Sequence, residues 1–381
     1  MNKLILYIQY TNPANYPPLL HSSQILANDG WKVVFLGTKS QGDCQFKLDS
    51  GLNVRVHLLW FQRPGFFQKI HYILYCLWGL AYALVFRPRW VYASELLASP
   101  MACFLSVIGY KVIYHEHDSP DSTEIEHGSV LRLLQCRKQA ALKSVCCILP
   151  NQERSHVFQK STGCPNVVTV WNCPSLSEVR SARSLRRSTP LRVLYHGSIV
   201  PARLPLAVID ALADSCFDIK LRIVGYETVG YQGHVTALLA RASKLGISNR
   251  IEFRKAVATR SELMELCAEC DIGLAFMPMQ STSINMRCMT GASNKPFDYL
   301  ACGLGVLVSD LPDWNELYVK PGYGLACNPE DSVSIRKALM WFWDHPREMA
   351  AMGEKGRHKI LSDWNYEKQF ERVSKLMNME R

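Results

Sequence analysis

Short apolar segments alternate with longer amphipathic segments along the chain, and this alternation constrains the fold more than any other feature. Strand-like runs at 3–9, 31–36 and 90–93 are each followed by a loop or by a helical pattern. A second series of the same kind begins at Leu191. Strands that alternate with helices are typical of parallel sheets covered by helices on both faces. The sequence therefore predicts an α/β protein built from doubly wound sheets.

The length and one polar segment divide the chain into domains. A chain of 381 residues is expected to form about two domains. Residues 175–190 are polar and basic and lack apolar periodicity, which is typical of an interdomain linker. We therefore place the first domain at 1–180 and the second at 181–365. The amphipathic pattern from Tyr366 predicts a C-terminal helix, within 366–381, that packs back on the first domain.

Residues 293–310, SNKPFDYLACGLGVLVSD, combine a predicted helix with a predicted strand. Ser293 and Asn294 are favourable N-cap residues, and Gly303 suits the position after the last helical turn. The pattern predicts a short helix at about 295–302 and then a buried strand.

The start of this predicted helix has the chemistry of a nucleotide site. A helix N-terminus favours an anion, and Lys295 adds a full positive charge beside it. Asp298, one turn later, can accept hydrogen bonds from a diol. The local pattern is equally compatible with a simpler interpretation, in which Asp298 only favours the helix N-terminus and Lys295 is a solvated cation.

The net charge and the cysteine content indicate which partners and which cellular compartment suit this protein. The net charge is +10, and residues 1–186 hold 19 Lys and Arg against 11 Asp and Glu, a balance of +8. Such a surface suits nucleic acid, an anionic lipid or an acidic substrate, although excess charge often serves only solubility.

The fourteen cysteines form no regular framework, which indicates a reducing cytoplasm without disulfides. The Cys267–Cys270 pair stands alone in a helical pattern and is a poor candidate for zinc or redox chemistry. The N-terminal residues enter a strand pattern directly, so we expect no secretory signal.

The most apolar stretch, residues 70–86, reads IHYILYCLWGLAYALVF. Its length lies at the short edge of a membrane span. A strand pattern follows at 90–93, so we favour a helix of the α/β domain that is buried or partly membrane-facing. Its aromatic residues and basic flanks are compatible with peripheral membrane contact.

Polar residues crowd the end of a predicted strand in KVIYHEHDSP. In open α/β sheets, ligands bind at the carboxyl ends of the strands. His115 and His117 alternate and would share one strand face, but the sequence offers no third metal ligand. Each histidine is compatible with catalysis or with a hydrogen-bonded role in a loop.

Several motifs together resemble the glycosyl transferases group 1 family, retaining enzymes of the GT-B fold related to family 4. These motifs are YHGS with Arg203 behind it, LRIVG, CDIGLAFMP and ASNKPFDYLACGLGVLVSDLPDWNEL, with VIYHEHDSP upstream. The resemblance covers essentially the whole chain. It implies two Rossmann-like domains that face each other across a cleft. It also implies an acceptor held mainly by the first domain and a nucleotide-sugar donor held mainly by the second.

The resemblance also implies roles for residues of the donor site. In the family an E-x7-E motif binds the donor, and Asp298 falls on the second acid, which contacts the ribose. Thr290 falls on the first acid and cannot carry charge. The backbone amides near Ala292, Ser293 and Asn294 would meet the diphosphate.

Two cations of the family also contact the diphosphate. The arginine that usually follows the glycine turn is replaced by Ser198, next to Gly197, and Arg203 lies near the usual lysine. Lys295 is expected to replace part of the missing charge. In the mechanism that the resemblance implies, the leaving diphosphate takes the acceptor proton on the same face of the sugar. Stabilisation of the leaving group is then the main catalytic contribution.

The resemblance therefore implies His117, Arg203 and Lys295 as catalytic residues, with His115 as the second choice for the histidine. We expect a hexosyl-type transferase that moves a sugar, most readily from a UDP- or GDP-sugar, to a glycan or lipid-linked acceptor in polysaccharide or glycolipid synthesis. We expect no metal cofactor, a cytoplasmic location and peripheral contact with an anionic membrane.

Three alternatives remain open at this point. A nucleotide-sugar epimerase of the same fold would need an additional acid and base pair, which the sequence does not offer. A non-catalytic nucleotide-sugar-binding or scaffold protein would explain Ser198 and Thr290. A nucleic-acid binder is the weakest alternative, because we find no motif for base stacking or groove reading.

Overall fold

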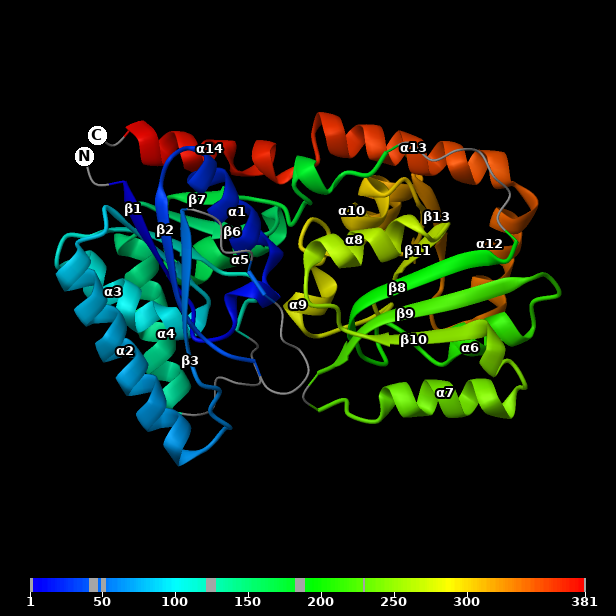
Figure 1. Cartoon of the computed structure of the whole chain (residues 1–381), viewed down its shortest axis with the longest axis horizontal. Helices are drawn as coiled ribbons and strands as arrows, with labels where there is room; N and C mark the ends of the chain where they lie inside the picture. The colour runs from blue at the N-terminus through cyan, green and yellow to red at the C-terminus, as the bar shows by residue number, and fades with distance from the viewer. Residues whose placement is uncertain are drawn as a thin grey trace. The chain divides into compact units, whose positions relative to one another are not determined.

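Two parallel sheets organise the chain, one in each of two units of the computed structural model (Figure 1). The structure describes residues 3–40, 47–48, 53–120, 128–181, 189–228 and 230–379. Unit 1 comprises residues 1–172, 283–292 and 366–381, and unit 2 comprises residues 173–282 and 293–365.

Sheet A of unit 1 has seven parallel strands in the order β3-β2-β1-β4-β5-β6-β7. The strands are β1 (Leu4–Ile8), β2 (Lys32–Thr38), β3 (Val54–Leu59), β4 (Trp90–Ser94), β5 (Lys111–His115), β6 (Cys146–Leu149) and β7 (Val167–Thr169). All residues of β1, β4 and β6 are buried, as expected for parallel strands covered on both faces. The strand order reverses between β1 and β4, which is the position where doubly wound sheets bind ligands.

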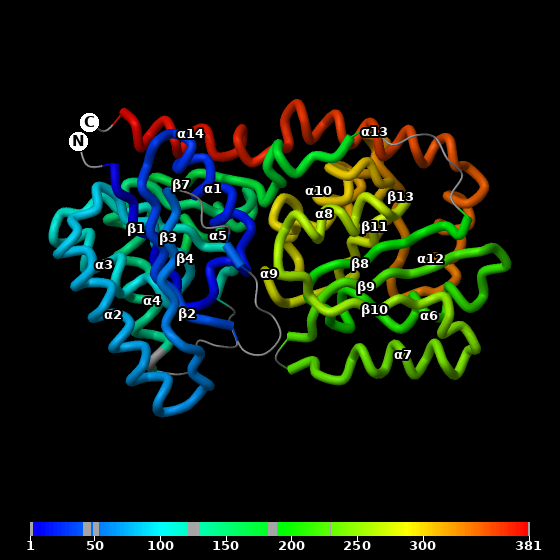
Figure 2. The backbone as a smooth tube through the Cα atoms, viewed as in Figure 1, coloured from blue at the N-terminus to red at the C-terminus, as the bar shows by residue number. Residues whose placement is uncertain are grey.

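Helices cover both faces of sheet A. The larger helices are α1 (Pro17–Asn28), α2 (Phe66–Phe86), α3 (Ser99–Val107), α4 (Gly128–Lys143), α5 (Gln152–Thr162) and α14 (Tyr366–Met379). One apolar core joins the sheet to α2, α3, α4 and α5, and a second joins its other face to α1 and α14. The trace of α14 runs beside α1 (Figure 2). The last helix of the chain therefore completes the first sheet's core.

Sheet B of unit 2 has six parallel strands in the order β10-β9-β8-β11-β12-β13. The strands are β8 (Leu191–Ile199), β9 (Ile219–Glu227), β10 (Ile251–Lys255), β11 (Ile272–Ala275), β12 (Gly305–Ser309) and β13 (Gly324–Cys327). Its order also reverses once, between β8 and β11. The prediction of an α/β protein with two doubly wound sheets is confirmed.

The main helices of unit 2 are α6 (Ala207–Ala213), α7 (His234–Lys244), α8 (Arg260–Ala268), α10 (Asn294–Ala301), α12 (Ser332–Asp344) and α13 (Pro346–Ser362). One apolar core joins sheet B to side chains of α6, α7, α12 and α13. Helix α10 packs against β11, β12, α8 and α13. Short helical segments that the sequence analysis did not predict include α9 (Ile284–Arg287), α11 (Pro312–Trp314) and a π-helical turn at Asn315–Val319.

The division between the units differs from the predicted boundaries in two places. Unit 2 begins at Cys173, so the start of the predicted linker, 175–181, belongs to unit 2, while 182–188 lies outside the described residues. Residues 283–292 belong to unit 1, although the predicted second domain contained them. Leu52, the predicted start of the third strand, also lies outside the described residues.

Candidate active site

The carboxyl end of β8 and the N-terminus of α10 meet in unit 2. Gly197 lies in β8 with a φ of +98°, a conformation that favours glycine. A Cβ atom at residue 197 would lie 3.3 Å from Nζ of Lys295. Ser293 is the N-cap residue of α10, as predicted, but its side chain makes no capping hydrogen bond. The structure thus brings together Gly197, Ser198, Ser293, Asn294 and Lys295 at one end of sheet B.

Tyr299 fixes α10 to the sheet. Its hydroxyl accepts a hydrogen bond from the His196 amide at 3.2 Å and donates one to the Leu274 carbonyl at 3.1 Å. Its ring lies against Gly273, where a Cβ would approach the ring to 2.1 Å. Because β8, β11 and α10 share this buried side chain, the position of Lys295 relative to β8 is set by the core.

Lys295 is a buried cation, with 7% of its surface exposed. Its ammonium lies 5.4 Å from the centre of the Tyr195 ring. Burial and, to a lesser degree, the positive charge of Arg203 lower the pKa of Lys295 to about 7, and Asp298 acts in the opposite direction. An anion bound at the start of α10 would stabilise the protonated form. The alternative of a solvated cation is therefore wrong for Lys295.

Arg203 lies beside the same end of β8. Its Nη1 donates to Oγ of Ser198 at 2.9 Å, and the Ser198 carbonyl accepts from the Tyr195 hydroxyl at 2.5 Å. The Ser198 side chain thus holds the guanidinium of Arg203 next to β8. Ser198 itself occupies the position at which the resemblance implied an arginine. The second cation predicted for the diphosphate stands within electrostatic reach of Lys295.

Asp298 is fully buried and belongs to an ion-pair network. Its two oxygens accept hydrogen bonds from Arg260 at 2.7 and 2.8 Å, and Arg260 also pairs with Glu178 at 2.9 Å. Nε2 of His196 lies 3.4 Å from the Asp298 carboxylate. Burial, Lys295 and Arg260 lower the pKa of His196 well below its usual value, so this histidine is neutral at pH 7. The structure gives Asp298 a structural role, and the ribose contact stays a prediction.

His117 follows β5 in unit 1, at the end of the sheet where the strand order reverses. Its Nε2 lies 3.1 Å from Oγ of Ser94, and its ring lies 4.8 Å from that of Tyr16 and 3.8 Å from that of His115. Burial lowers its pKa to about 3, with a further contribution from Arg154. His117 is therefore neutral at physiological pH, and its Nδ1 is a buried atom without a hydrogen-bond partner among the described residues.

His115 occupies a more enclosed position. Its Nδ1 lies 2.7 Å from the hydroxyl of Tyr92, and its ring is fully buried in sheet A. Burial and the neighbouring His117 lower its pKa well below the usual value. The strand β5 ends at His115, so His117 does not lie on a strand face as predicted, although the two rings are in contact. Within the described ranges, no group of three His, Cys, Asp or Glu residues is arranged to hold a metal ion.

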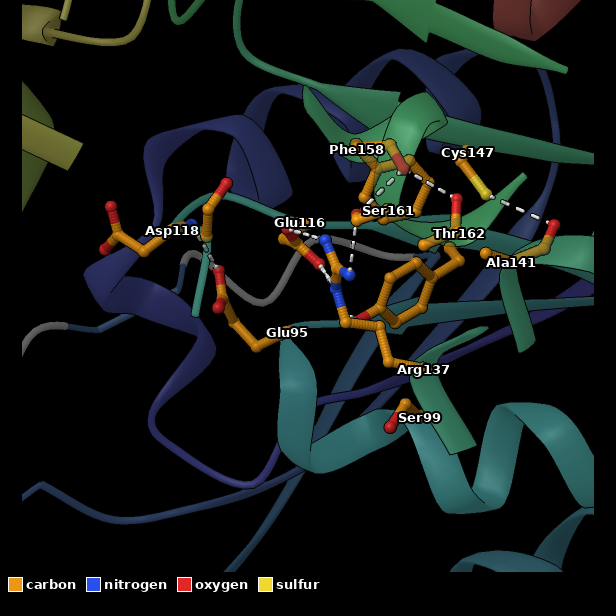
Figure 3. A network of polar contacts seen from close by, with 12 residues as sticks. Glu95, Ser99, Glu116, Asp118, Arg137, Ala141, Cys147, Phe158, Ser161 and Thr162 are labelled. Atoms are coloured by element: carbon orange, nitrogen blue, oxygen red, sulfur yellow. Dashed lines mark hydrogen bonds and ion pairs between the residues drawn. The ribbon is translucent and has the colours of Figure 1, made fainter. Parts of the chain in front are cut away.

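The loop that carries His117 is held by carboxylates on both sides (Figure 3). Glu95, which has a φ of +73°, accepts from the amides of His117 and Asp118 at 2.9 and 3.3 Å. Glu116 is buried and pairs with Arg137 through two hydrogen bonds of 2.5 and 2.8 Å. Figure 3 shows the Arg137 guanidinium between Glu116 and Ser161. Among the described residues, both histidine rings of this polar run keep a buried nitrogen without a hydrogen-bond partner, Nδ1 of His117 and Nε2 of His115.

Thr290 lies in the segment 283–292 of unit 1, whereas the other predicted donor-binding residues belong to unit 2. Its carbonyl accepts from Nδ2 of Asn151 at 2.9 Å. Arg154 donates to the carbonyls of Cys288 at 3.0 Å and His117 at 2.6 Å. Arg154 thus joins the segment to the histidine loop inside unit 1.

Sequence reasoning missed the three charged residues that order these sites, namely Arg154, Arg260 and Glu95. The local pattern gave no signal for Arg154 or Arg260, because each is the partner of a residue distant in the sequence. Glu95 directly follows the buried strand β4, and His117 likewise lies just after β5, so the position of Glu95 after a buried strand was the signal that we did not use.

The chain was compared with known proteins. Residues 206–375 match a family model described as glycosyl transferase-like. No curated protein sequence matches the chain. Among solved structures, the sucrose-phosphate synthase of Thermosynechococcus elongatus has a TM-score of 0.71 at 14% identity, with 99% of this chain and 98% of that chain covered.

Two further solved structures share the fold over nearly the full length. The HepE protein of Anabaena, solved with UDP and glucose, has a TM-score of 0.74 at 16% identity, with 99% of both chains covered. WaaG, a glycosyltransferase involved in lipopolysaccharide biosynthesis, has a TM-score of 0.64 at 15% identity, with 98% of this chain and 99% of that chain covered. The GT-B fold that the sequence motifs predicted is confirmed by these similarities over nearly the full chain, and the resemblance to glycosyl transferases is confirmed by the family model over residues 206–375.

Proposed function

We propose that this protein is a retaining, nucleotide-sugar-dependent glycosyltransferase whose donor diphosphate binds at the start of α10. The observation that carries the proposal is the pair of cations, Lys295 and Arg203, beside the uncapped N-terminus of α10. A helix N-terminus and two cations form a site for a diphosphate. The glycosyl transferase-like match over residues 206–375 supports this assignment, as does the HepE structure with UDP and glucose.

In the proposed reaction, the bond between the sugar C1 and the diphosphate oxygen breaks, and the acceptor oxygen bonds to C1 on the same face. The acceptor proton passes to an oxygen of the leaving diphosphate. Negative charge grows on that group in the transition state, so Arg203, Lys295 and the α10 amides would stabilise the transition state more than the ground state. No step needs a resident metal, and we propose that activity persists in EDTA.

His117 would contact the sugar of the donor or its phosphate as a neutral imidazole. Its lowered pKa and its unused Nδ1 support this role, because a neutral imidazole can accept or donate one hydrogen bond without repelling a cation. The Ser94 hydroxyl and the Tyr16 ring would hold the imidazole in place.

We propose that the donor is a UDP- or GDP-sugar and that the acceptor is a glycan or lipid-linked sugar in cell-surface polysaccharide or glycolipid synthesis. The involvement of WaaG in lipopolysaccharide biosynthesis supports the acceptor class. The basic first half supports contact with an anionic membrane as a peripheral protein. The free state of the thirteen described cysteines is compatible with a cytoplasmic location.

A second candidate is a nucleotide-sugar-binding protein of the same fold without transfer activity. Ser198 and Thr290, which replace charged residues expected from the family resemblance, favour this candidate. Both candidates predict donor binding, and only the first predicts consumption of the donor.

A melting-temperature screen followed by a turnover assay tests the proposal. Ligands that bind the native state raise the melting temperature according to their concentration and affinity. We expect one of UDP, GDP or ADP, and one of its sugars, to raise it in the wild type and much less in Lys295→Met. Radiolabelled sugar from that donor should then appear in acceptor or free sugar. Binding without release would support the second candidate, and the absence of binding by every nucleotide would refute both.

A further inference from the structure

The solvent-facing side of α2 in unit 1 is apolar along most of its length. We call Phe66, Ile70, Ile73, Leu74, Leu77 and Leu84 the α2 stripe, and each of these side chains is more than 40% exposed. Residues 66, 70, 73, 77 and 84 follow one another at intervals of three, four or seven residues, and Leu74 is adjacent to Ile73, so the six side chains lie on one side of the helix. A helix on a globular surface normally turns its polar side to water. The α2 stripe is thus an exposed apolar patch of the kind that marks an interaction site.

The opposite side of α2 is fixed to the rest of unit 1. Tyr75 donates from its hydroxyl to the Leu36 carbonyl at 2.9 Å, and Tyr110 donates to the Ala83 carbonyl at 2.8 Å. Gly79 packs on Met101 of α3 so closely that a Cβ would lie 2.5 Å from its sulfur.

Near the start of the helix, the Tyr10 hydroxyl lies 2.7 Å from Nδ1 of His71. Among the described residues, α2 is the one helix long and apolar enough to cross a membrane. Because it is attached to the fold along its length, we place it flat on a surface instead of across a bilayer.

The charge around α2 identifies the chemistry of the partner. Between residues 50 and 94 the sequence has five basic residues, Arg55, Arg63, Lys69, Arg87 and Arg89, and no acidic one. Arg63, Lys69 and Arg87 are exposed near the two ends of α2. The sequence of α4, which packs against α3, also contains no Asp or Glu, and it exposes Arg132, Lys138 and Lys143. An apolar stripe with a purely basic surrounding matches an anionic lipid surface, in which acyl chains lie beneath negative headgroups.

We propose that the α2 stripe is the surface with which this protein docks on an anionic membrane, with the stripe in the headgroup and acyl boundary and with the flanking basic residues on lipid phosphates. The inference rests on the proposed function in one respect: the reason for docking would be access to a lipid-linked acceptor. The docking itself is independent of donor binding, because the stripe belongs to unit 1 and the donor cations belong to unit 2.

Co-sedimentation with vesicles tests the docking surface. The wild-type protein should pellet with vesicles of phosphatidylcholine that contain about one third phosphatidylglycerol, and not with pure phosphatidylcholine. Added salt should weaken the binding, because it screens the basic residues. Ile73→Glu combined with Leu77→Glu should lower the partition coefficient at least tenfold. Lys69→Gln combined with Arg87→Gln should also lower it and should reduce its dependence on salt.

Leu239→Glu combined with Met340→Glu is the matched control, since these residues are exposed apolar positions on helices of unit 2. This control should sediment like the wild type. All variants should keep the wild-type melting temperature and its increase with donor nucleotide, which separates loss of docking from failure of the proposed function.

Two results would overturn the inference. One is equal sedimentation of the wild type and the stripe variant, or no sedimentation of either. The other is a concentration-dependent dimer, measured by light scattering, that the stripe variant abolishes while vesicle binding is absent. The α2 stripe would then be a contact between copies of this chain.

Discussion

The carboxylate of Asp298 and the guanidinium of Arg260 form a paired contact, with Nη2 to Oδ1 at 2.7 Å and Nη1 to Oδ2 at 2.8 Å. Asp298 lies in α10 and Arg260 is the first residue of α8, so the pair joins two helices of unit 2. Asp298 has no exposed surface, and Arg260 carries a second carboxylate partner, Glu178. The start of α10 is thus positioned by charges as well as by apolar packing.

Asp298→Ala should reduce both stability and donor affinity. Loss of one partner from a buried ion pair costs roughly 3–5 kcal/mol, and we expect the lower end because Arg260 keeps Glu178. Denaturant unfolding measures the stability, and calorimetric titration well below the melting temperature measures the donor Kd. Arg260→Met is the control for lost stability alone. If Asp298→Ala leaves the donor Kd unchanged, Asp298 does not contact the ribose.

Lys295 should take up a proton when the donor binds. Its pKa of about 7 leaves it largely neutral at pH 8, and a bound diphosphate would favour the charged form. Calorimetry at pH 8 in buffers of different ionisation enthalpy should report an uptake close to one proton, and almost none at pH 6. Lys295→Met should abolish the uptake, and Lys244→Met, an exposed lysine on α7, should not. Uptake that is equal at the two pH values would contradict this assignment.

The lowered pKa of Lys295 also predicts how the contribution of this residue to stability changes with pH. The pKa of Lys295 is about 7 in the folded state, below its usual value of 10.5, so the unfolded chain binds more protons between these two values. The free energy of unfolding contributed by this residue therefore rises as the pH increases through that window. The difference in unfolding free energy between the wild type and Lys295→Met, measured from pH 7 to pH 10, should grow with pH in favour of the wild type.

His117→Ala should lower turnover by roughly a hundredfold or more, as expected for loss of a group that acts at the reacting centre, while the nucleotide Kd changes little. Because its pKa is about 3, His117 should contribute no inflection near pH 6.5 to the pH profile of turnover. The profiles of the wild type and of His117→Ala should therefore have the same shape in that range. His358→Ala, an exposed histidine on α13, is the matched control. Loss of nucleotide binding in His117→Ala would contradict the placement of this residue beside the sugar.

His117 should also make the fold sensitive to acid. Its folded pKa lies below its unfolded value of 6.5, so the unfolded chain binds the extra proton between about pH 3 and 6.5. The stability contributed by neutral His117 is present above pH 6.5 and falls as the pH drops through that window. The slope of the wild-type unfolding free energy against pH should therefore be steeper than that of His117→Ala.

Arg203→Ala should lower turnover by about 10²- to 10³-fold, the usual cost of removing one donor to a developing anion. Its effect on the melting temperature should be small, because Arg203 is partly exposed and donates to the uncharged hydroxyl of Ser198. Arg254→Ala, in which an exposed arginine paired with Glu252 is removed, is the control. A large loss of stability with proportionate loss of turnover would identify a structural arginine.

Much of the fold was predictable because each strand and helix leaves a local pattern. The buried strands read as continuous apolar runs, and the predicted helix at 295–302 corresponds to α10 at Asn294–Ala301. The domain boundaries were less predictable, because they depend on contacts distant in sequence. Residues 283–292 join unit 1 through Asn151, Arg154 and Asn172, and none of these partners lies near the segment in sequence.

The candidate site was predictable in its residue types but not in its charges. The motif identified Lys295, yet its lowered pKa depends on its burial beside Arg203. The motif also identified Asp298, but Arg260 is 38 residues away in the sequence, and only the fold brings the two together. The apolar character of α2 was evident in the sequence, whereas the side that it exposes depends on the tyrosines that fix its other side.

The release of nucleoside diphosphate from a panel of UDP-, GDP- and ADP-sugars tests the central claim most directly. The wild-type protein should consume one of these donors, with product release quantified chromatographically. The double variant Arg203→Ala and Lys295→Met should lose this turnover while it remains folded. Absence of turnover with every donor, or equal turnover by the wild type and the folded double variant, would contradict the account.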